Sequence, residues 1–499
     1  MDMKFVLSIC FSFFHLFLYA QTIHNVVDWG ADPNGNSDAV PAIQKAIDAA
    51  DPKQKTIIYF PKGKYLIASY NKTINSLENY CIKLRSNLEI RGEGGKSILF
   101  LADHLFEGSD SSKNAHLFYG RQVQEVSFKQ FSIDLNGAKN APGVGVKKNH
   151  AAIFVTHGKK VYLQNLQILN SAGTNMVNIK GNGNFLQIDN CVFKNEMKVQ
   201  QNNCHQYDFS FVYSEWESTY INRCEIMLEK DTASICKKQR PYNGGIEIHG
   251  SDSRVSDCIV SNCFPGMYIA STGKKMKNVV VMNNKFIGCT KGISFWLEHP
   301  MDSITINKNT ITIQSEKQEH FRYCTGIEVP NGNASDYNKI LANASPIHHL
   351  TITHNMIKAL PNAENASGII LHSIHDSKMG HNTILGMNRF GLALLGSRWG
   401  SSHSLIFQNN FWIDADRKNK KEQNQPIYFF DKSMGDSALK CSFNKIKLFR
   451  NTVYLPKKKK GIAATLKSGF VLIDTPDKCK TKPNQCVEFI NHISSESMK

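Results

Sequence analysis

Beyond its N-terminus the sequence lacks any apolar run near the roughly 20 residues that a bilayer crossing needs, which excludes a polytopic membrane protein. It also lacks the C-x-x-C spacing of common zinc sites, so we expect no metal centre and interpret the cysteines as structural or buried thiols. Its hydrophobic content of 41% and charged content of 20% exclude wholesale disorder. Acidic residues are fewer than basic ones, 42 against 59, and the net charge of +17 favours a polyanionic partner.

The first 20 residues have the form of a secretory signal. Lys4 precedes the apolar run 5–19, and the small residue Ala20 precedes the expected cleavage point. We therefore predict a secreted protein, extracellular or periplasmic, with neither nucleic acid nor membrane as its partner. Cys479 and Cys486, which flank a short polar loop, are the disulfide that we expect in such a compartment.

A short motif recurs along the chain, with Asn or Cys just before a hydrophobic pair. Its intervals are mostly 25 to 34 residues, which is typical of one turn of a solenoid. Stacked asparagines can hydrogen-bond from turn to turn, and Cys fills the same position as a small buried group. The register comprises Cys191, Cys224, Cys258, Asn284, Asn309, Asn355, Asn382 and Asn410.

A second strand follows a glycine in each interval, as in Gly245–Gly250. Because side chains alternate along a strand, Ile246 and Ile248 should point into the core, and Glu247 and His249 should point out. The same parity predicts an outer stripe on the following strands. Both registers together predict an all-β fold, a parallel β-helix. The outer stripe consists of Tyr268, Ala270, Ser294, Trp296, Glu328 and His372.

The stretch 27–65 carries the pattern D-W-G-A-D-x-x-G-x-x-D, then A-I-Q-x-A-I and I-Y-F-P-x-G-x-Y. It resembles the N-terminal cap of the pectin-lyase-like right-handed β-helix superfamily. We expect an amphipathic capping helix over 39–50, a β-helix over 21–455 with an inserted loop or lobe near 331–346, and a C-terminal cap or tail over 456–499.

The spacing of Glu247 and His249 suggests acid–base chemistry. Residues i and i+2 on one strand face lie roughly 6.5 to 7 Å apart, within the range that separates the two groups of an inverting glycosidase. Glu247 would be the acid and His249 the base. The alternative to a catalytic role is that the two are ordinary polar residues on a solvated strand face.

The N-G-G-I-E-I-H-G segment, with the signal and the positive charge, resembles the ι-carrageenases of glycoside hydrolase family 82. The resemblance implies an endo-acting, inverting hydrolase of a sulfated galactan, with Glu247 as acid. That family has an Asp where this chain has His249, so the base stays open among His249, Asp208 and Glu215.

Five further residues are candidates for binding substrate. Tyr268 and Trp296 suit stacking on sugar rings, and three cations could hold anionic groups: Lys180, Arg254 and Arg322. The same cations leave open a lyase acting on an acidic polysaccharide, or a polysaccharide-binding β-helix without catalysis. We expect a monomer that requires no cofactor, with a structural calcium ion as an option.

Overall fold

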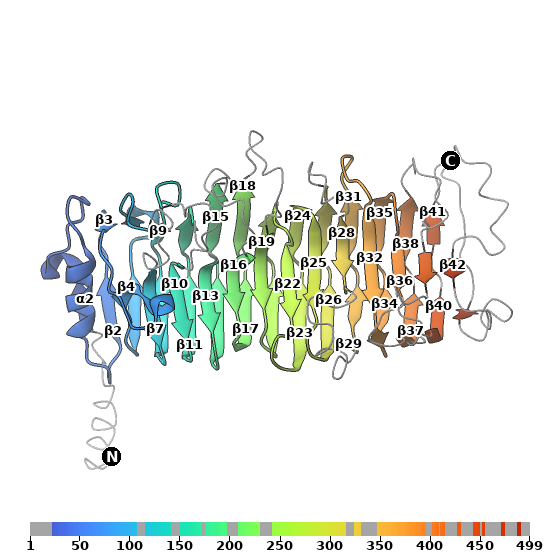
Figure 1. The fold of residues 1–499 in the computed structure, drawn as a ribbon, viewed down its shortest axis with the longest axis horizontal. Helices are drawn as coiled ribbons and strands as arrows, with labels where there is room; N and C mark the ends of the chain where they lie inside the picture. Colours follow the sequence, from blue (N-terminus) through green and yellow to red (C-terminus); the bar gives the residue numbers. More distant parts are fainter. Residues whose placement is uncertain are drawn as a thin grey trace, which may run out of the picture.

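Each interval of the repeat folds as one coil of three short strands, and the coils stack into a solenoid (Figure 1). The structure is a computed structural model. It describes residues 22–106, 115–140, 150–171, 175–196, 208–229, 242–315, 324–330, 347–395, 402–408, 410–414, 427–430, 443–449, 452–454, 471–474 and 487–490.

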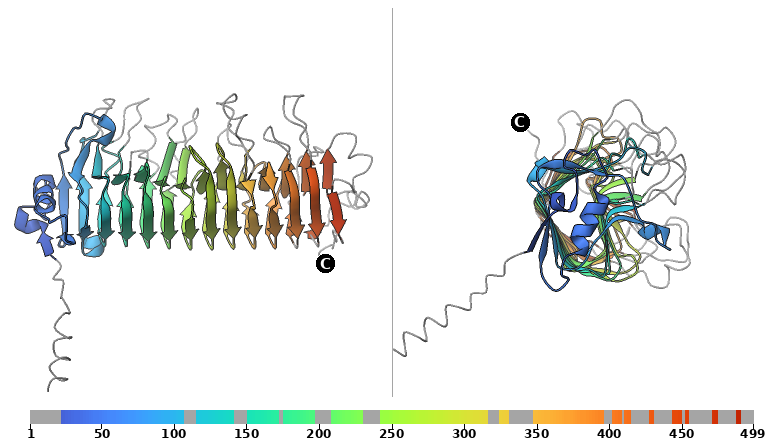
Figure 2. Two further views of the ribbon diagram at one scale, coloured as in Figure 1. Left: turned by 90° about the horizontal axis from the view of Figure 1, so that it is seen from below. Right: turned by 90° about the vertical axis from the view of Figure 1, so that its left-hand side faces the viewer.

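Three long sheets, here called A, B and C, run the length of the solenoid and contain 17, 13 and 13 strands. Equivalent strands of successive coils pair in parallel, so each coil contributes one rung to each sheet. Seen along the axis, the sheets surround one common interior (Figure 2). One continuous core of buried apolar side chains extends from Val26 to Leu405. The predicted parallel β-helix is therefore confirmed.

Sheet A contains β1 (Thr22–Asn25), β2 (Thr56–Tyr59), β5 (Leu88–Arg91), β8 (Gln124–Lys129), β11 (Lys159–Gln164), β14 (Asn184–Asp189), β17 (Glu217–Asn222), β20 (Ser253–Ser256), β23 (Met276–Met282), β26 (Met301–Asn307), β29 (Ile347–His348), β30 (Thr351–Thr353), β33 (Ile374–His375), β34 (Lys378–Gly380), β37 (Ser402–Gln408), β40 (Phe443–Phe449) and β43 (Val487–Ile490). Sheet B contains β3 (Gly63–Ile67), β6 (Ser97–Leu101), β9 (Ser132–Asp134), β12 (Gln167–Leu169), β15 (Val192–Glu196), β18 (Glu225–Glu229), β21 (Ile259–Ser261), β24 (Lys285–Cys289), β27 (Thr310–Ile313), β31 (Met356–Ala359), β35 (Thr383–Met387), β38 (Phe411–Asp414) and β41 (Thr452–Tyr454). Sheet C contains β4 (Tyr80–Lys83), β7 (His116–Arg121), β10 (Ile153–Thr156), β13 (Asn175–Lys180), β16 (Asp208–Ser214), β19 (Tyr242–Ile248), β22 (Met267–Ala270), β25 (Lys291–Trp296), β28 (Thr325–Glu328), β32 (Ser367–His372), β36 (Leu392–Leu395), β39 (Ile427–Phe430) and β42 (Val471–Asp474).

The recurring Asn and Cys positions form a ladder inside the turn between sheets A and B. Asn309 shows the pattern: its Oδ1 accepts from the backbone N–H and the Nδ2 of Asn284, both at 3.0 Å. Its Nδ2 donates to Val281 O and to Asn355 Oδ1, also at 3.0 Å. The residue before each ladder position from Cys191 to Asn382 is left-handed, for example Lys308 with φ 55°, which turns the chain from one sheet into the next.

The N-terminal end of the solenoid carries α2 (Val40–Asp48), which packs on the first coils through Ile43 and Ile47 (Figure 1). The chain also forms three short 3-10 helices, η1 (Val26–Trp29), η2 (Ser76–Glu78) and η3 (Gly94–Lys96).

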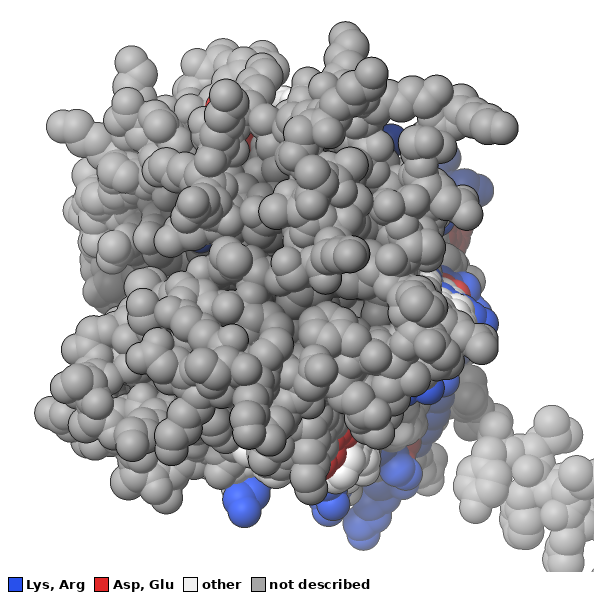
Figure 3. All heavy atoms as spheres, turned by 90° about the vertical axis from the view of Figure 1, so that its right-hand side faces the viewer, with Lys and Arg blue, Asp and Glu red and all other residues white. Residues whose placement is uncertain are grey.

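At the other end, the sheets continue beyond residue 455, where the sequence predicted a cap or tail. β42 pairs with β39, and β43 pairs with β40, so both still belong to the solenoid. Viewed on this end, described Lys and Arg side chains are visible along its rim, with Asp and Glu between them (Figure 3). The segment 331–346 and the residues Cys479 and Cys486 lie outside the described residues.

One buried histidine near the N-terminal end should make the fold acid-sensitive. His116 is fully buried, stacks on Phe154, donates through Nε2 to Leu77 O and accepts through Nδ1 from the Ala151 N–H. Burial lowers its pKa to about 4. The unfolded chain takes up this proton near pH 6.5, so stability should fall by about 3 kcal/mol as the pH drops from 6.5 to 4.

Chemical unfolding at several pH values measures this effect. The His116→Gln variant, which cannot titrate at this position, should lose less stability over the same interval, although its stability at neutral pH is lower. Equal losses in the two proteins would contradict the assignment.

Candidate active site

Glu247 lies on the outer face of sheet C, as its strand parity predicts. In β19 its neighbours Ile246 and Ile248 are buried in the core. The carboxylate is not freely solvated, however: Glu247 is 8% exposed and His249, just past the strand end, is 4% exposed.

The two side chains contact each other directly. His249 Nε2 lies 2.9 Å from Glu247 Oε1, and Ser210 Oγ donates to Glu247 Oε2 at 2.7 Å. The expected gap of roughly 6.5 to 7 Å describes the backbone positions, but both side chains bend toward one another. No water-sized space separates them, so they are not the two opposed groups of an inverting glycosidase.

His249 is also engaged at its other ring nitrogen. Nδ1 lies 2.5 Å from Thr272 Oγ1, and the His249 backbone N–H donates to Ser214 O at 2.8 Å. Both ring nitrogens are therefore hydrogen-bonded, which fixes the imidazole beside the Glu247 carboxylate.

A second group of side chains borders the pair on the preceding coils. The Tyr213 ring centre lies 4.8 Å from that of His249, and Lys180 Nζ lies 5.2 Å from the Tyr213 ring centre. Tyr213 OH donates to Glu215 Oε1 at 2.7 Å, and Glu215 Oε2 accepts from the Gly181 N–H at 2.6 Å. Lys180 is thus brought to the site, as predicted, and Tyr213 was missed.

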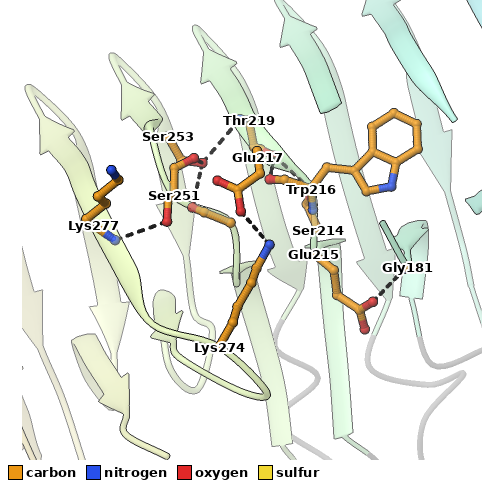
Figure 4. A network of polar contacts seen from close by, with 11 residues as sticks. Gly181, Ser214, Glu215, Trp216, Glu217, Thr219, Ser251, Ser253, Lys274 and Lys277 are labelled. Carbon is orange, nitrogen blue, oxygen red and sulfur yellow. Dashed lines mark hydrogen bonds and ion pairs between the residues drawn. The ribbon is translucent and has the colours of Figure 1, made fainter. Parts of the chain in front are cut away.

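At the corner between sheets C and A, Glu215 contacts Gly181 beside Trp216 (Figure 4). Trp216 is fully buried, and its indole N–H donates to Lys180 O at 3.0 Å. The next coil turns the same corner at Gly250, where a Cβ atom would lie 1.8 Å from Trp216 O. Only glycine therefore lets the chain pass Trp216 immediately after His249.

The remaining predicted binding residues separate into two groups. Tyr268 is the in-register partner of Glu247 on the next coil. Trp296, 38% exposed, follows one coil further and donates its indole N–H to Glu298 Oε1 at 3.0 Å. Arg254, by contrast, is exposed on β20 of sheet A, because the corner at Gly250 carries the chain onto another face. Arg322 lies outside the described residues.

Asp208 does not lie opposite Glu247. The in-register partner of Glu247 on β16 is Tyr213, and Asp208 pairs with Tyr242 instead. Five residues at about 3.3 Å each put the Asp208 backbone about 16 Å away along the strands. Its side chain is outside the described part of the chain. Glu215 is closer, since it is one coil and two residues from Glu247, about 8 Å between Cα atoms.

No helix among the described residues is long and apolar enough to cross a membrane. Within the same residues, no three His, Cys, Asp or Glu side chains are grouped so that they could hold a metal ion.

Comparison with known proteins extends these findings. A family model described as a periplasmic copper-binding protein (NosD) matches residues 222–434. No group of three His, Cys, Asp or Glu side chains that could hold such a metal lies within the described part of that range. The mannuronan C5-epimerase AlgE6 of Azotobacter vinelandii is 36% identical over 24% of this chain and 13% of its own length. The plasmin and fibronectin-binding protein A of Streptococcus pneumoniae is 29% identical over 35% of this chain. Each alignment covers about a fifth or less of the relative's length.

The solved structures that resemble the chain share its fold. The tailspike protein of E. coli bacteriophage HK620, in complex with a pentasaccharide, has a TM-score of 0.58 at 15% identity and covers 88% of this chain and 77% of its own. A variant of it with a hexasaccharide has a TM-score of 0.60. The model of the rhamnogalacturonase A/epimerase, pectate lyase-like family matches residues 23–296, more than half of the chain. The protein therefore belongs to the rhamnogalacturonase A/epimerase, pectate lyase-like family.

Proposed function

We propose that the protein is an exported enzyme that acts on an anionic polysaccharide, with Glu247 as the group that transfers a proton. The observation that carries this proposal is the Glu247 carboxylate, which points out of sheet C and is held by Ser210 and His249. A carboxyl fixed at both oxygens is oriented before substrate arrives, as general acid–base catalysis requires. Family membership and the oligosaccharides bound by tailspike proteins of the same fold support a polysaccharide substrate.

In finer terms we propose a glycoside hydrolase. Glu247 would protonate the glycosidic oxygen as the bond to the anomeric carbon breaks, and a second carboxylate would take a proton from the attacking water. Glu215 is the better candidate for the second role, because it lies one coil and two residues from Glu247 and is closer than Asp208. Hydrogen bonds from Tyr213 OH and the Gly181 N–H hold the Glu215 carboxylate in one orientation.

The substrate that we propose is a sulfated galactan of the ι-carrageenan type. The net charge of +17 and the position of Lys180 beside Tyr213 support an anionic polymer. Two other cations on sheet C form ion pairs, Arg121 with Glu78 and Lys291 with Glu328. Lys180 is therefore the cation on which we base sulfate recognition. We keep the expectations of a monomer, of no required cofactor and of an optional structural calcium.

A second candidate is proton abstraction from a uronate, by elimination or epimerisation. The cluster of Lys180, Tyr213 and His249 favours it, because Lys180 could neutralise a uronate carboxylate while Tyr213 moves the C5 proton. The similarity to mannuronan C5-epimerases points the same way.

A substrate panel separates the candidates. The protein is incubated with ι-, κ- and λ-carrageenan, alginate and polygalacturonate, and three products are followed together. A hydrolase releases reducing ends without ultraviolet absorbance, and a lyase releases ends with an absorbing unsaturated sugar. An epimerase changes the uronate composition by NMR and leaves chain length intact. Binding without any product would leave a binding module and contradict the proposed enzyme.

A further inference from the structure

A second carboxylate lies on the same outer column of sheet C as Glu247. The column runs in register from Glu247 through Tyr268 and Ser294 to Glu328. Three strand spacings put Glu328 about 14 Å from Glu247 along the solenoid axis. Glu328 is 9% exposed, as deeply set as Glu247.

Glu328 is held as Glu247 is held, from the preceding coil. Lys291 forms an ion pair with the Glu328 carboxylate. On the strand of Glu328, the in-register partner of Lys291 is Thr325, three residues before Glu328. Ser210, which donates to Glu247, has as its in-register partner Gly244, again three residues before the glutamate. The two sites share one geometry, but the donor is a cation at Glu328 and a hydroxyl at Glu247.

Two buried hydroxyls beside the ion pair have no hydrogen-bond partner among the described residues. They are Thr325 Oγ1 and Ser367 Oγ, on side chains 0% and 1% exposed. Both belong to the column of Lys291. Thr325 is in register with Lys291, whose ammonium meets the outward Glu328 carboxylate, and we place both hydroxyls on this outer side. Buried hydroxyls without partners are costly and call for an explanation.

We propose that Lys291, Thr325, Glu328 and Ser367 form a subsite for the hydroxyl groups of a sugar unit of the substrate chain. This proposal rests on the proposed function at Glu247. The ion pair offers an acceptor and a donor side by side, which suits sugar hydroxyls. The two hydroxyls complete the set of partners. The subsite lies about three strand spacings from Glu247, so only a chain of several sugars can contact both places at once.

Binding of hexasaccharides and disaccharides from ι-carrageenan and from alginate, measured by calorimetry, tests the subsite. Thr325→Val and Ser367→Ala should each weaken hexasaccharide binding roughly fivefold to tenfold and leave disaccharide binding unchanged. Their thermal midpoints should stay the same or rise, because each loses a hydroxyl without a partner. Lys291→Met should weaken hexasaccharide binding further, compared with Lys358→Met on the exposed face of sheet B.

The outcomes distinguish this proposal from the one on which it rests. Unchanged hexasaccharide affinity in both Thr325→Val and Ser367→Ala overturns the subsite, even if Glu247 proves essential for turnover. Full turnover by Glu247→Gln overturns the proposed function, whatever the affinities are. A wild-type protein that binds neither hexasaccharide overturns both.

Discussion

Glu247→Gln should lower turnover on the polysaccharide substrate by roughly a thousandfold, within the range that general acid–base groups contribute. The amide keeps the shape of the carboxyl and can still meet Ser210 and His249, but it cannot exchange a proton with substrate. Substrate affinity should therefore change little. Initial rates of product release and equilibrium binding, measured on the same preparation, give the two quantities.

Glu225→Gln on β18 is the matched control, since it makes the same chemical change on sheet B. It should keep wild-type turnover. Wild-type turnover by Glu247→Gln as well would remove Glu247 from the mechanism. Loss of binding together with turnover would point to a structural role for the carboxylate.

Asn309→Ala should destabilise the solenoid by about 4 kcal/mol, because four hydrogen bonds of a side chain 1% exposed are lost together. The Asn284 N–H and the Asn355 Oδ1 would lose a buried partner. Chemical or thermal denaturation of the two proteins measures the difference.

Asn307→Ala, on the solvent side of the same turn, should cost much less than Asn309→Ala. Asn309→Cys should lie between them, since Cys258 already occupies a ladder position, where its Sγ accepts from the Cys224 N–H at 3.5 Å, a weaker bond than that of an amide oxygen. Equal stability of the Asn307 and Asn309 variants would show that the ladder contributes little.

The ladder and the outer stripe were predictable because both follow from short periodicities. The ladder position that Asn309 occupies recurs once in each coil, and Glu247 lies between two core isoleucines. The strand register is fixed in a parallel coil, since a shift of one residue would expose the isoleucines and turn Glu247 into the core.

The partners of Glu247 were not predictable for two physical reasons. Side-chain bending is invisible in strand spacing, so the contact with His249 was missed. Strand alternation also breaks near the start of β19: a Cβ atom on Gly245 would point at Val260 in the core, and Ile246 points inward as well. Ser210, on the paired strand, therefore faces Glu247 despite its offset.

Sequence proximity also misled at corners. Arg254 is only seven residues from Glu247, yet the turn at Gly250 places it on sheet A. A prediction of neighbours in a solenoid needs the coil register, which locates Tyr213 and Tyr268 beside Glu247 although they are far apart in sequence.

The amide ladder makes consecutive coils interchangeable as building units. Asn284 and Asn309, separated by 25 residues, present the same donor and acceptor to the coils on either side. Duplicating that unit would leave every ladder bond satisfiable and would move Glu328 away from Glu247 by one further spacing of about 4.8 Å. Copying a single gene segment could therefore increase the distance between these two carboxylates, and the interior of the solenoid would need no redesign.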